Sequence, residues 1–540
     1  MDEQARIPVS LPRENPTVSY WQDPPDGIAN LRVTAELPES AETVIIGSGI
    51  SGAAIAWNLL EDVRSCKKES MNVVMLEARG ACSGATGRNG GHTKAASYRS
   101  FLDMAESVGL QEAAQIASLE LDNIQAVHKF AQDHNIDCDL NPCETIDIIY
   151  DEAQWNKAHE AVAAMRAALP EGHPAAKYTF HSAEEVRSKF HCHSNSSNGR
   201  EEKLYGGVSY FAGSLSSYKL VIGILKLCTE LGLNLQTNTP ATSLTKNSDG
   251  TWTVATPRGN IKASRVILAT NGYTAALLPE KFQGVIVPLR GQVTAHRPGS
   301  NLPLKGCLPT TYSFIYENGY EYMIPRPAGS LHAGDIIIGG GLARAPDEGL
   351  HEYGTTDDTT INETISAYLR DTTPRYFSLE GWGDDHPDGR IRKEWTGIMG
   401  YSPDGFPFVG GIQEEAYHGL WVSVSFQGHG MVLCWMCARA LVEMIRISHD
   451  FTQGPNDGVA GTLDRAEKLS EWFPDAFWVS SDRLRKRFKG RLHYPSFKLR
   501  VQPELISVRK RHGMSCNWSL APWRLVTGRT KSAWGCKPES

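Results

Sequence analysis

A strand, a glycine turn and a helix follow one another without a break between residues 43 and 60. The apolar run of residues 44–46 (VII) ends at a Gly-x-Gly-x-x-Gly motif, and residues 53–60 (AAIAWNLL) have a helical composition. In such a unit the first glycine permits a tight turn, the second lets a pyrophosphate approach the backbone, and the third lets the helix pack on the strand. The N-terminus of the helix then faces the phosphates. The motif therefore predicts a dinucleotide site, with an ordinary strand-to-helix turn as the alternative.

Glu77 extends this prediction to the adenosine half of the dinucleotide. It ends a second apolar strand at residues 73–76 (VVML), where an acid is expected to hold the ribose hydroxyls. The spacing from the glycines is longer than usual, and the polar insert at residues 64–72 accounts for the difference. A surface carboxylate at a strand end is the alternative.

A second glycine-rich loop follows at residues 78–92 (ARGACSGATGRNGGH). Its five glycines predict a backbone that passes close to a bound group, and its polar residues suit a pyrophosphate and a planar ring edge. A simple nicotinamide enzyme has no need of such a loop, whereas a flavoprotein that holds its cofactor extended does. The loop therefore favours a flavin over a nicotinamide dinucleotide.

With these residues the chain resembles the FAD-dependent oxidoreductases of the D-amino-acid-oxidase family, and within it the amine and γ-glutamylputrescine oxidase-like branch. The likeness rests on the RNGG sequence at residues 88–91 and on the pattern W-x-G-x-x-x-x-S-x-D-x-x-P-x-x-G at residues 395–410. It covers about residues 15–490. It implies FAD as cofactor and an α/β fold, in which a Rossmann-like FAD-binding domain, discontinuous in sequence, accompanies an α+β substrate lobe built on an antiparallel sheet.

A further turn, at residues 428–430, precedes a long apolar helix. Backbone N–H groups and the helix dipole at such a turn stabilise negative charge on a reduced flavin by roughly 0.3–2 kcal/mol, and by more in a dry site. Some relatives attach FAD covalently through a histidine near the second loop, so His92 is either such a tether or a residue that only lines the site. The residues expected to contact FAD are Gly47, Ser48, Gly49, Ile50, Ser51, Gly52, Glu77, Ala78, Arg79, Thr86, Gly87, Arg88, Asn89, Gly90, Gly91, His92, Pro240, Ala241, Thr270, Asn271, Gly272, Gly397, Asp404, Gly428, His429, Gly430 and Met431.

The order of patterns along the chain gives the expected domain organisation. It consists of an extended surface leader (1–40), the first FAD-binding part (41–100), a helical cap (101–205), the second FAD-binding part (206–285), the substrate-binding antiparallel sheet (286–400), the third FAD-binding part (401–448), a C-terminal helix and basic loop (449–493) and a basic, disordered tail (494–540).

Composition narrows the class of protein. The chain has 540 residues, 41% of them hydrophobic and 21% charged, which is ordinary for a soluble globular protein. Residues 481–540 carry 15 Lys and Arg against 3 Asp and Glu, while the net charge of the chain is −7, so the body is acidic. No apolar run is long enough to span a membrane and no secretory signal is visible, which together predict a cytoplasmic protein.

Eleven cysteines without a framework are expected to be free thiols. Cys434 and Cys437 have the spacing of a redox pair, but they lie in an apolar run that favours a buried helix. His191, Cys192 and His193 lack a second ligand cluster, so no metal site is predicted. Nucleic-acid binding by the basic tail is conceivable but not expected.

The resemblance implies the reaction. Flavin removes a hydride from a carbon next to an amine nitrogen, water hydrolyses the imine, and O2 takes the electrons and becomes H2O2. The partners are then a small-molecule amine or amino acid and O2. The residues chosen for the reaction are His429 for flavin electrostatics, Arg290 for carboxylate anchoring and Tyr322 for the pocket wall.

Three alternatives stay open at this stage. The chain could be an FAD dehydrogenase that acts on a biosynthetic intermediate with another acceptor, a simple NAD dehydrogenase, or a non-catalytic nucleotide-binding scaffold. The sequence does not predict an oligomeric state.

Overall fold

The computed structural model describes residues 1–65, 70–193, 195–197, 200–317, 319–453 and 458–491. The basic tail predicted at residues 494–540 and part of the polar insert at residues 64–72 lie outside the described residues.

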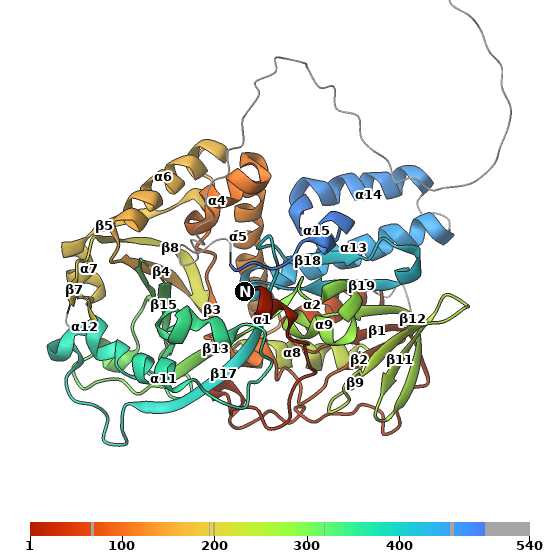
Figure 1. The fold of residues 1–540 in the computed structure, drawn as a ribbon, viewed down its shortest axis with the longest axis horizontal. Coiled ribbons are helices and arrows are strands. Elements are labelled where there is room, and N and C mark those ends of the chain that lie inside the picture. The colour runs from red at the N-terminus through yellow and green to blue at the C-terminus, as the bar shows by residue number, and fades with distance from the viewer. Residues whose placement is uncertain (66–69, 194, 198–199, 318, 454–457, 492–540) are drawn as a thin grey trace, which may run out of the picture. The chain divides into compact units, whose positions relative to one another are not determined.

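The first sheet has eight strands and a parallel centre with the neighbour order β9, β2, β1, β12 and β19 (Figure 1). A hairpin, β10 and β11, and the antiparallel strand β18 complete it. Its strands are β1 (Ser40–Ile46), β2 (Val73–Leu76), β9 (Asn234–Gln236), β10 (Ser243–Lys246), β11 (Trp252–Thr256), β12 (Gly259–Leu268), β18 (Phe408–Gly411) and β19 (Leu420–Val424). Three segments far apart in the sequence therefore build one sheet, which confirms the discontinuous Rossmann-like fold.

Helices cover this sheet, and its central strands are buried accordingly. Every residue of β2 is buried, as expected of a parallel strand with both faces covered. Helix α2 (Ile50–Leu59) packs between α8 (Ser217–Glu230) and α13 (Cys434–Gln453) (Figure 1). The third glycine of the motif lets α2 lie close to the turn that precedes it, because a Cβ atom on Gly52 would lie 2.0 Å from Gly47 O.

The second sheet has nine strands and is antiparallel except where β14 pairs with β4. Its strands are β3 (His92–Thr93), β4 (Asn141–Ile149), β5 (Thr179–Ser182), β8 (Gly206–Ser214), β13 (Val287–His296), β14 (Thr311–Tyr316), β15 (Gly319–Pro325), β16 (Ile336–Gly339) and β17 (Ile391–Tyr401). This is the antiparallel sheet expected of the substrate lobe. Strand β8 pairs here with β4, although the segment that begins at residue 206 was expected to return to the nucleotide fold.

Most of the remaining elements are helical. They are α1 (Asp2–Arg6), α3 (Glu61–Arg64), α4 (Tyr98–Val108), α5 (Leu110–Asp133), α6 (Glu152–Ala168), α7 (Ala183–Phe190), α9 (Thr274–Leu277), α10 (Pro279–Phe282), α11 (Glu363–Arg370), α12 (Thr372–Trp382), α14 (Gly458–Trp472) and α15 (Ser481–Arg485), with a two-stranded hairpin of β6 (Asn195–Ser197) and β7 (Arg200–Glu202). The sequence S-A-E-E at residues 182–185 is typical of a capping box, and Ser182 and Glu185 form one at the start of α7. Helix α8 is capped by Ser216.

The leader is not only a surface segment. Trp21 is buried in the main core, and Ser19 is 1% exposed. Trp21 is thus part of the core and Tyr20 packs against it, while the residues on either side, Ser19 and Gln22, contact the second glycine loop.

Two expectations from composition can be compared with the described residues. Cys434 and Cys437 are free and buried in α13, as the apolar run predicted. None of the described helices combines the length and apolarity needed to cross a membrane.

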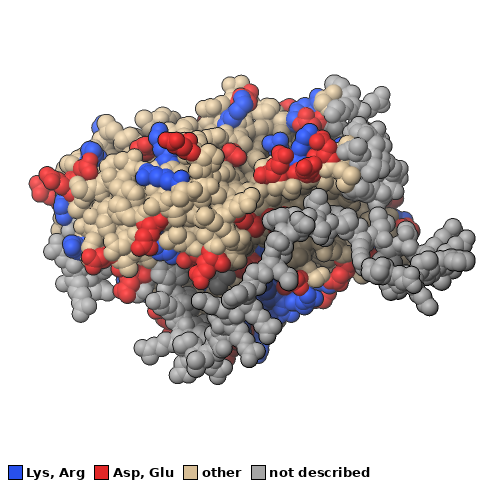
Figure 2. Space-filling view, turned by 90° about the horizontal axis from the view of Figure 1, so that it is seen from above, with Lys and Arg blue, Asp and Glu red and all other residues tan. Residues whose placement is uncertain are grey.

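On the face shown in Figure 2, described acidic and basic side chains are interspersed rather than gathered by sign.

Candidate active site

The glycine turn requires glycine at each predicted position. Gly47 has φ +107°, and a Cβ atom there would lie 2.6 Å from Ala269 O. A Cβ atom on Gly49 would lie 3.1 Å from Thr86 Oγ1, so the turn runs close against the second glycine loop. Helix α2 then begins at Ile50 with Gly49 as N-cap, and residues 49–51 border a cavity. Ile50 N donates to Thr86 Oγ1 (3.1 Å). A ligand with phosphates fits this end of the cavity.

Glu77 stands at the carboxyl end of β2 beside this turn. Its carboxylate accepts hydrogen bonds from Ser48 N (3.1 Å), Ser48 Oγ (2.7 Å) and Arg79 N (3.0 Å). Glu77 also lines the cavity. The carboxylate is therefore fixed at the position from which an acid can hold ribose hydroxyls.

The second glycine loop is held by its carbonyl groups. The carbonyl oxygens of four successive residues, 86–89, accept side-chain hydrogen bonds from three other parts of the chain. The bonds are Ser217 Oγ to Thr86 O (2.7 Å), Ser19 Oγ and Gln22 Nε2 to Gly87 O (2.6 and 2.7 Å), Trp395 Nε1 to Arg88 O (2.6 Å) and Trp21 Nε1 to Asn89 O (2.5 Å). Trp395 is the first residue of the pattern at residues 395–410. Its hydrogen bond to Arg88 O therefore connects this pattern to the RNGG sequence at residues 88–91.

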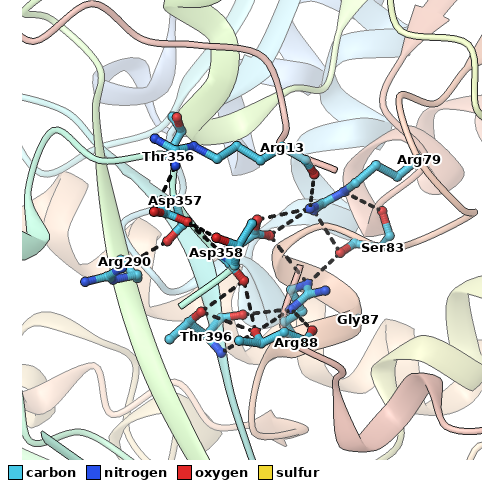
Figure 3. Close-up of polar contacts among 12 residues, drawn as sticks. Arg13, Arg79, Ser83, Gly87, Arg88, Arg290, Thr356, Asp357, Asp358 and Thr396 are labelled. Carbon is cyan, nitrogen blue, oxygen red and sulfur yellow. Dashed lines mark hydrogen bonds and ion pairs between the residues drawn. The ribbon is translucent and has the colours of Figure 1, made fainter. Parts of the chain in front are cut away.

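Two arginines of this loop pair with a buried aspartate (Figure 3). Arg79 Nη1 lies 2.9 Å from Asp358 Oδ2, and Arg88 Nε lies 3.7 Å from the same oxygen. Arg88 also donates to Thr17 O and Thr396 O. Burial lowers the pKa of Arg88 to about 10, and the charge of Asp358 opposes that shift. Both guanidinium groups thus serve the loop's own structure, and the sequence did not single out Asp358.

Arg290 is neutralised in a similar way. Its guanidinium lies 2.6 Å from Glu352 Oε2 and donates to Asp357 O and Thr360 Oγ1. The residue lines the cavity, but its charge is already paired with a carboxylate that is 3% exposed. This geometry argues against Arg290 as the anchor of a substrate carboxylate.

Tyr322 lies where the cavity meets the second glycine loop. A Cβ atom on Gly90 would lie 2.3 Å from Tyr322 Cε2, so the glycine makes room for the ring. Burial raises the pKa of Tyr322, which keeps its hydroxyl protonated. With Tyr316 and Tyr320 it lines this part of the cavity with aromatic rings; the sequence predicts a place in the pocket wall for Tyr320 and Tyr322.

His92 and Lys94 follow the loop on the same wall. His92 Nε2 lies 2.7 Å from Thr311 Oγ1, and burial, with the charge of Lys94, holds the pKa of His92 well below its usual value. Lys94 Nζ pairs with buried Asp147 and donates to Ser313 Oγ (2.6 Å). Burial lowers the pKa of Lys94 to about 8, against the charge of Asp147. His92 is therefore neutral at physiological pH.

The turn before α13 supplies the opposite wall. Gln427 and Gly428 have φ +56° and +74°, which turns the chain sharply after β19. His429 Nε2 lies 3.2 Å from Glu120 Oε1, a buried carboxylate of α5. Both residues border the cavity.

Most of the predicted site residues meet around this one cavity, whose volume of about 440 Å³ is in the range of ligand sites. Those that line it are Gly47, Ser48, Gly49, Ile50, Ser51, Glu77, Ala78, Arg79, Thr86, Arg88, Asn89, Gly90, His92, Ala241, Thr270, Asn271, Arg290, Tyr322, Gly397, Gly428, His429, Gly430 and Met431. Lining residues that the sequence analysis did not name include Lys94, Arg99, Glu120 and Tyr316.

Six predicted contacts lie behind the cavity wall instead: Gly52, Gly87, Gly91, Pro240, Gly272 and Asp404. A Cβ atom on Gly91 or Gly272 would lie within 2.4 Å of a carbonyl oxygen, so these two glycines allow close packing of the backbone. Asp404 accepts two hydrogen bonds of 2.9 Å from Arg483. Burial alone would raise the pKa of Asp404, but Arg483 and Lys486 outweigh that effect and lower it. Asp404 thus fixes its own segment.

Comparison with known proteins agrees with this geometry. The family model described as FAD dependent oxidoreductase (DAO) matches residues 42–444. The probable oxidoreductase OrdL of Rhizobium meliloti (strain 1021) is 24% identical over 409 residues, which cover 75% of this chain and 82% of the relative. The gamma-glutamylputrescine oxidoreductase of Escherichia coli (strain K12) is 22% identical over 421 residues, with coverage of 75% and 84%. The solved structure of glycine oxidase from Geobacillus kaustophilus has a TM-score of 0.56 at 18% identity and covers 75% of this chain and 95% of that one.

Proposed function

We propose, from the premise that this chain belongs to the FAD-dependent oxidoreductase family, that it oxidises a C–N bond of an amine or amino acid with O2 as electron acceptor. One observation carries the proposal. A single cavity joins the glycine turn and Glu77 to His429 and the tyrosines of the second sheet. The site for the dinucleotide therefore continues into a wall against which a small substrate can bind.

The residues of the cavity fit FAD. The glycine turn and the start of α2 would hold the pyrophosphate, and Glu77 would hold the ribose. The second glycine loop and the turn before α13 would border the ring system. When bound, FAD supplies the acceptor for a hydride from the carbon next to the amine nitrogen and passes both electrons to O2, which takes up two protons and becomes H2O2.

The chain's own residues prepare the substrate side. Tyr316, Tyr320 and Tyr322 offer an aromatic wall against which the apolar part of a substrate can pack. His92 is neutral, so it adds no charge to this wall. The oxidised substrate is an imine, which water hydrolyses. The names of the relatives agree with this substrate class, because glycine and γ-glutamylputrescine both carry an amine.

Anaerobic mixing with candidate substrates tests the proposal. The purified protein should be yellow, with absorbance near ~450 nm, and an amine, an N-methyl amino acid or an amino acid should bleach it without O2. A matched pair, alanine and 2-methylalanine, serves as control because the second compound has no hydrogen on the reacting carbon. If no amine bleaches the flavin, the proposal is wrong.

Admitting air then separates oxidase from dehydrogenase. Rapid return of the colour with formation of one H2O2 per substrate supports O2 as the acceptor. Slow return, accelerated by an artificial acceptor, would instead support a dehydrogenase.

A further inference from the structure

Glu120 is a buried carboxylate that borders the cavity and has no part in the function proposed above. It lies on α5 and is 2% exposed. Ser97 Oγ donates a hydrogen bond to Glu120 Oε2, and His429 Nε2 lies 3.2 Å from Glu120 Oε1. An ionised carboxylate at this depth requires a positive partner, because removing it from water costs several kcal/mol.

Several other cations on the cavity wall already have a carboxylate. Lys94 pairs with Asp147, and Arg290 pairs with Glu352. The two arginines of the second glycine loop share Asp358. His429 is the basic side chain that lies within ion-pair distance of Glu120, and an imidazolium gives the pair a net charge of zero.

The same face of α5 also holds the backbone beside His429. Asn123, three residues after Glu120, donates to Met431 O (3.1 Å) and accepts from Met436 N (3.0 Å). Asn123 is completely buried. Helix α5 thus fixes the main chain of this turn through Asn123 and contacts its one ionisable side chain through Glu120.

The two members of the pair differ in their access to the cavity. The side chain of His429 is 33% exposed, while that of Glu120 is 3% exposed. The imidazole therefore stands in front of the carboxylate. Two further ionisable side chains lie near this pair. Cys434 packs against Gly430, and the charge of Glu120 acts on the pKa of Tyr178. Burial raises the pKa of both groups, so both are neutral and leave the charge balance to the pair.

We propose that Glu120 is a positioning residue that keeps His429 as an imidazolium and directs its positive charge into the cavity, where it favours the reduced form of FAD. The inference rests on the proposed function only in requiring bound FAD, and no amine substrate is needed to test it.

The direction of the change in reduction potential tests this assignment. In Glu120→Gln, no carboxylate stabilises the imidazolium, so His429 becomes neutral. The positive charge that faces the cavity is lost, and the reduction potential of the flavin falls. If His429 were neutral in the native protein, the same substitution would only remove a negative charge, and the potential would rise. The two cases have opposite signs.

The experiment is photoreduction of the flavin with reference dyes of known potential at fixed pH, without substrate. We expect Glu120→Gln to decrease the equilibrium constant for flavin reduction by about fivefold or more, the size of a partly buried histidine charge. His429→Gln should also decrease it, because this substitution removes the positive charge itself. The double variant Glu120→Gln/His429→Gln should match Glu120→Gln. Glu112→Gln makes the same chemical change on α5 outside the residues that line the cavity, and should change nothing.

An unchanged or raised potential in Glu120→Gln overturns the proposal. If that variant does not fold, His429→Gln decides: a lower potential supports the proposal, and an unchanged or higher one overturns it. Photoreduction needs no amine substrate, so the reduction potentials can be measured even if no amine bleaches the flavin. Failure of the proposed function and failure of this proposal can therefore be distinguished.

Discussion

Asp358 lies between the two arginines of the second glycine loop, with its side chain 1% exposed. Replacing it with asparagine leaves Arg79 and Arg88 buried without a carboxylate. Loss of one partner from a buried ion pair costs about 3–5 kcal/mol, so we expect Asp358→Asn to lower the free energy of unfolding by this amount. Urea unfolding followed by circular dichroism measures the change.

The neighbouring residue provides the control for this prediction. Asp357 pairs with Arg13, whose side chain is 50% exposed, at 2.9 Å. Exposed pairs contribute about 0–1 kcal/mol, and asparagine can keep the hydrogen bonds that Asp357 accepts from Thr359. Asp357→Asn should therefore have a small effect. Equal effects of the two substitutions would show that burial of the pair does not matter.

Single residues were predictable where their role is local. The glycines and Glu77 act within one strand, turn and helix, and the structure places them as the motif predicts. The roles of Arg79 and Asp404 depend on partners 279 and 79 positions away, which no local pattern reveals. The charge of Arg290 was assigned to a substrate for the same reason, since Glu352 is 62 positions distant.

The sequence around Glu120 contains a pattern that indicates a buried charge. Ile116, Glu120, Ile124 and Val127 fall at spacings of three and four residues, so a charged residue lies within the apolar stripe of α5. A charge at such a position is rarely buried unless it is paired. The pattern therefore identifies a buried charge, but only the fold shows that His429 is beside it.

At the scale of elements, the leader holds the second glycine loop. Ser19 and Trp21 each bind a loop carbonyl, at Gly87 and Asn89. Removing both donors leaves Gly87 O with only the hydrogen bond from Gln22 Nε2 and takes away the bond that Trp21 Nε1 donates to Asn89 O. A buried acceptor left unsatisfied costs about 1–3 kcal/mol. If the loop contacts FAD, we expect Ser19→Ala/Trp21→Phe to weaken FAD binding by about tenfold or more. Titration of the apoprotein with FAD, followed by quenching of flavin fluorescence, measures this.

Val18 offers a matched control within the same segment. It lies directly before Ser19 in the sequence and is 59% exposed, so Val18→Ala should leave FAD affinity unchanged. An unchanged affinity in the double variant would mean that the loop keeps its conformation without the leader.

The positions of helices and strands along the chain were easier to predict than the strands with which each strand pairs. Apolar residues at helical spacing in residues 111–134 and 152–169 predict α5 and α6 within one residue, and the capping box at Ser182 predicts the start of α7. Strand β8 alternates as any strand does, and its pairing with β4 rather than with the first sheet is set by contacts about 65 residues apart along the chain. The order of strands is thus a long-range property.

At the scale of the whole molecule, the cavity wall comes from both sheets. The first sheet supplies the glycine turn and Glu77, and the second sheet supplies the tyrosines and His92. A ligand that fills the cavity therefore contacts parts of the chain from residue 47 to residue 431. Such a ligand stabilises the folded state by mass action.

This predicts that removal of FAD lowers the melting temperature and that added FAD restores it. At a free concentration of 100 Kd, FAD should stabilise the fold by about 2.7 kcal/mol. If the glycine turn and Glu77 bind only the ADP half, as proposed, ADP should stabilise the apoprotein partly. FMN, which lacks the adenosine, should do so least. Thermal unfolding of the apoprotein with each compound at equal concentration measures the order. If FMN stabilises the protein as well as FAD does, the first glycine motif does not bind the adenosine half.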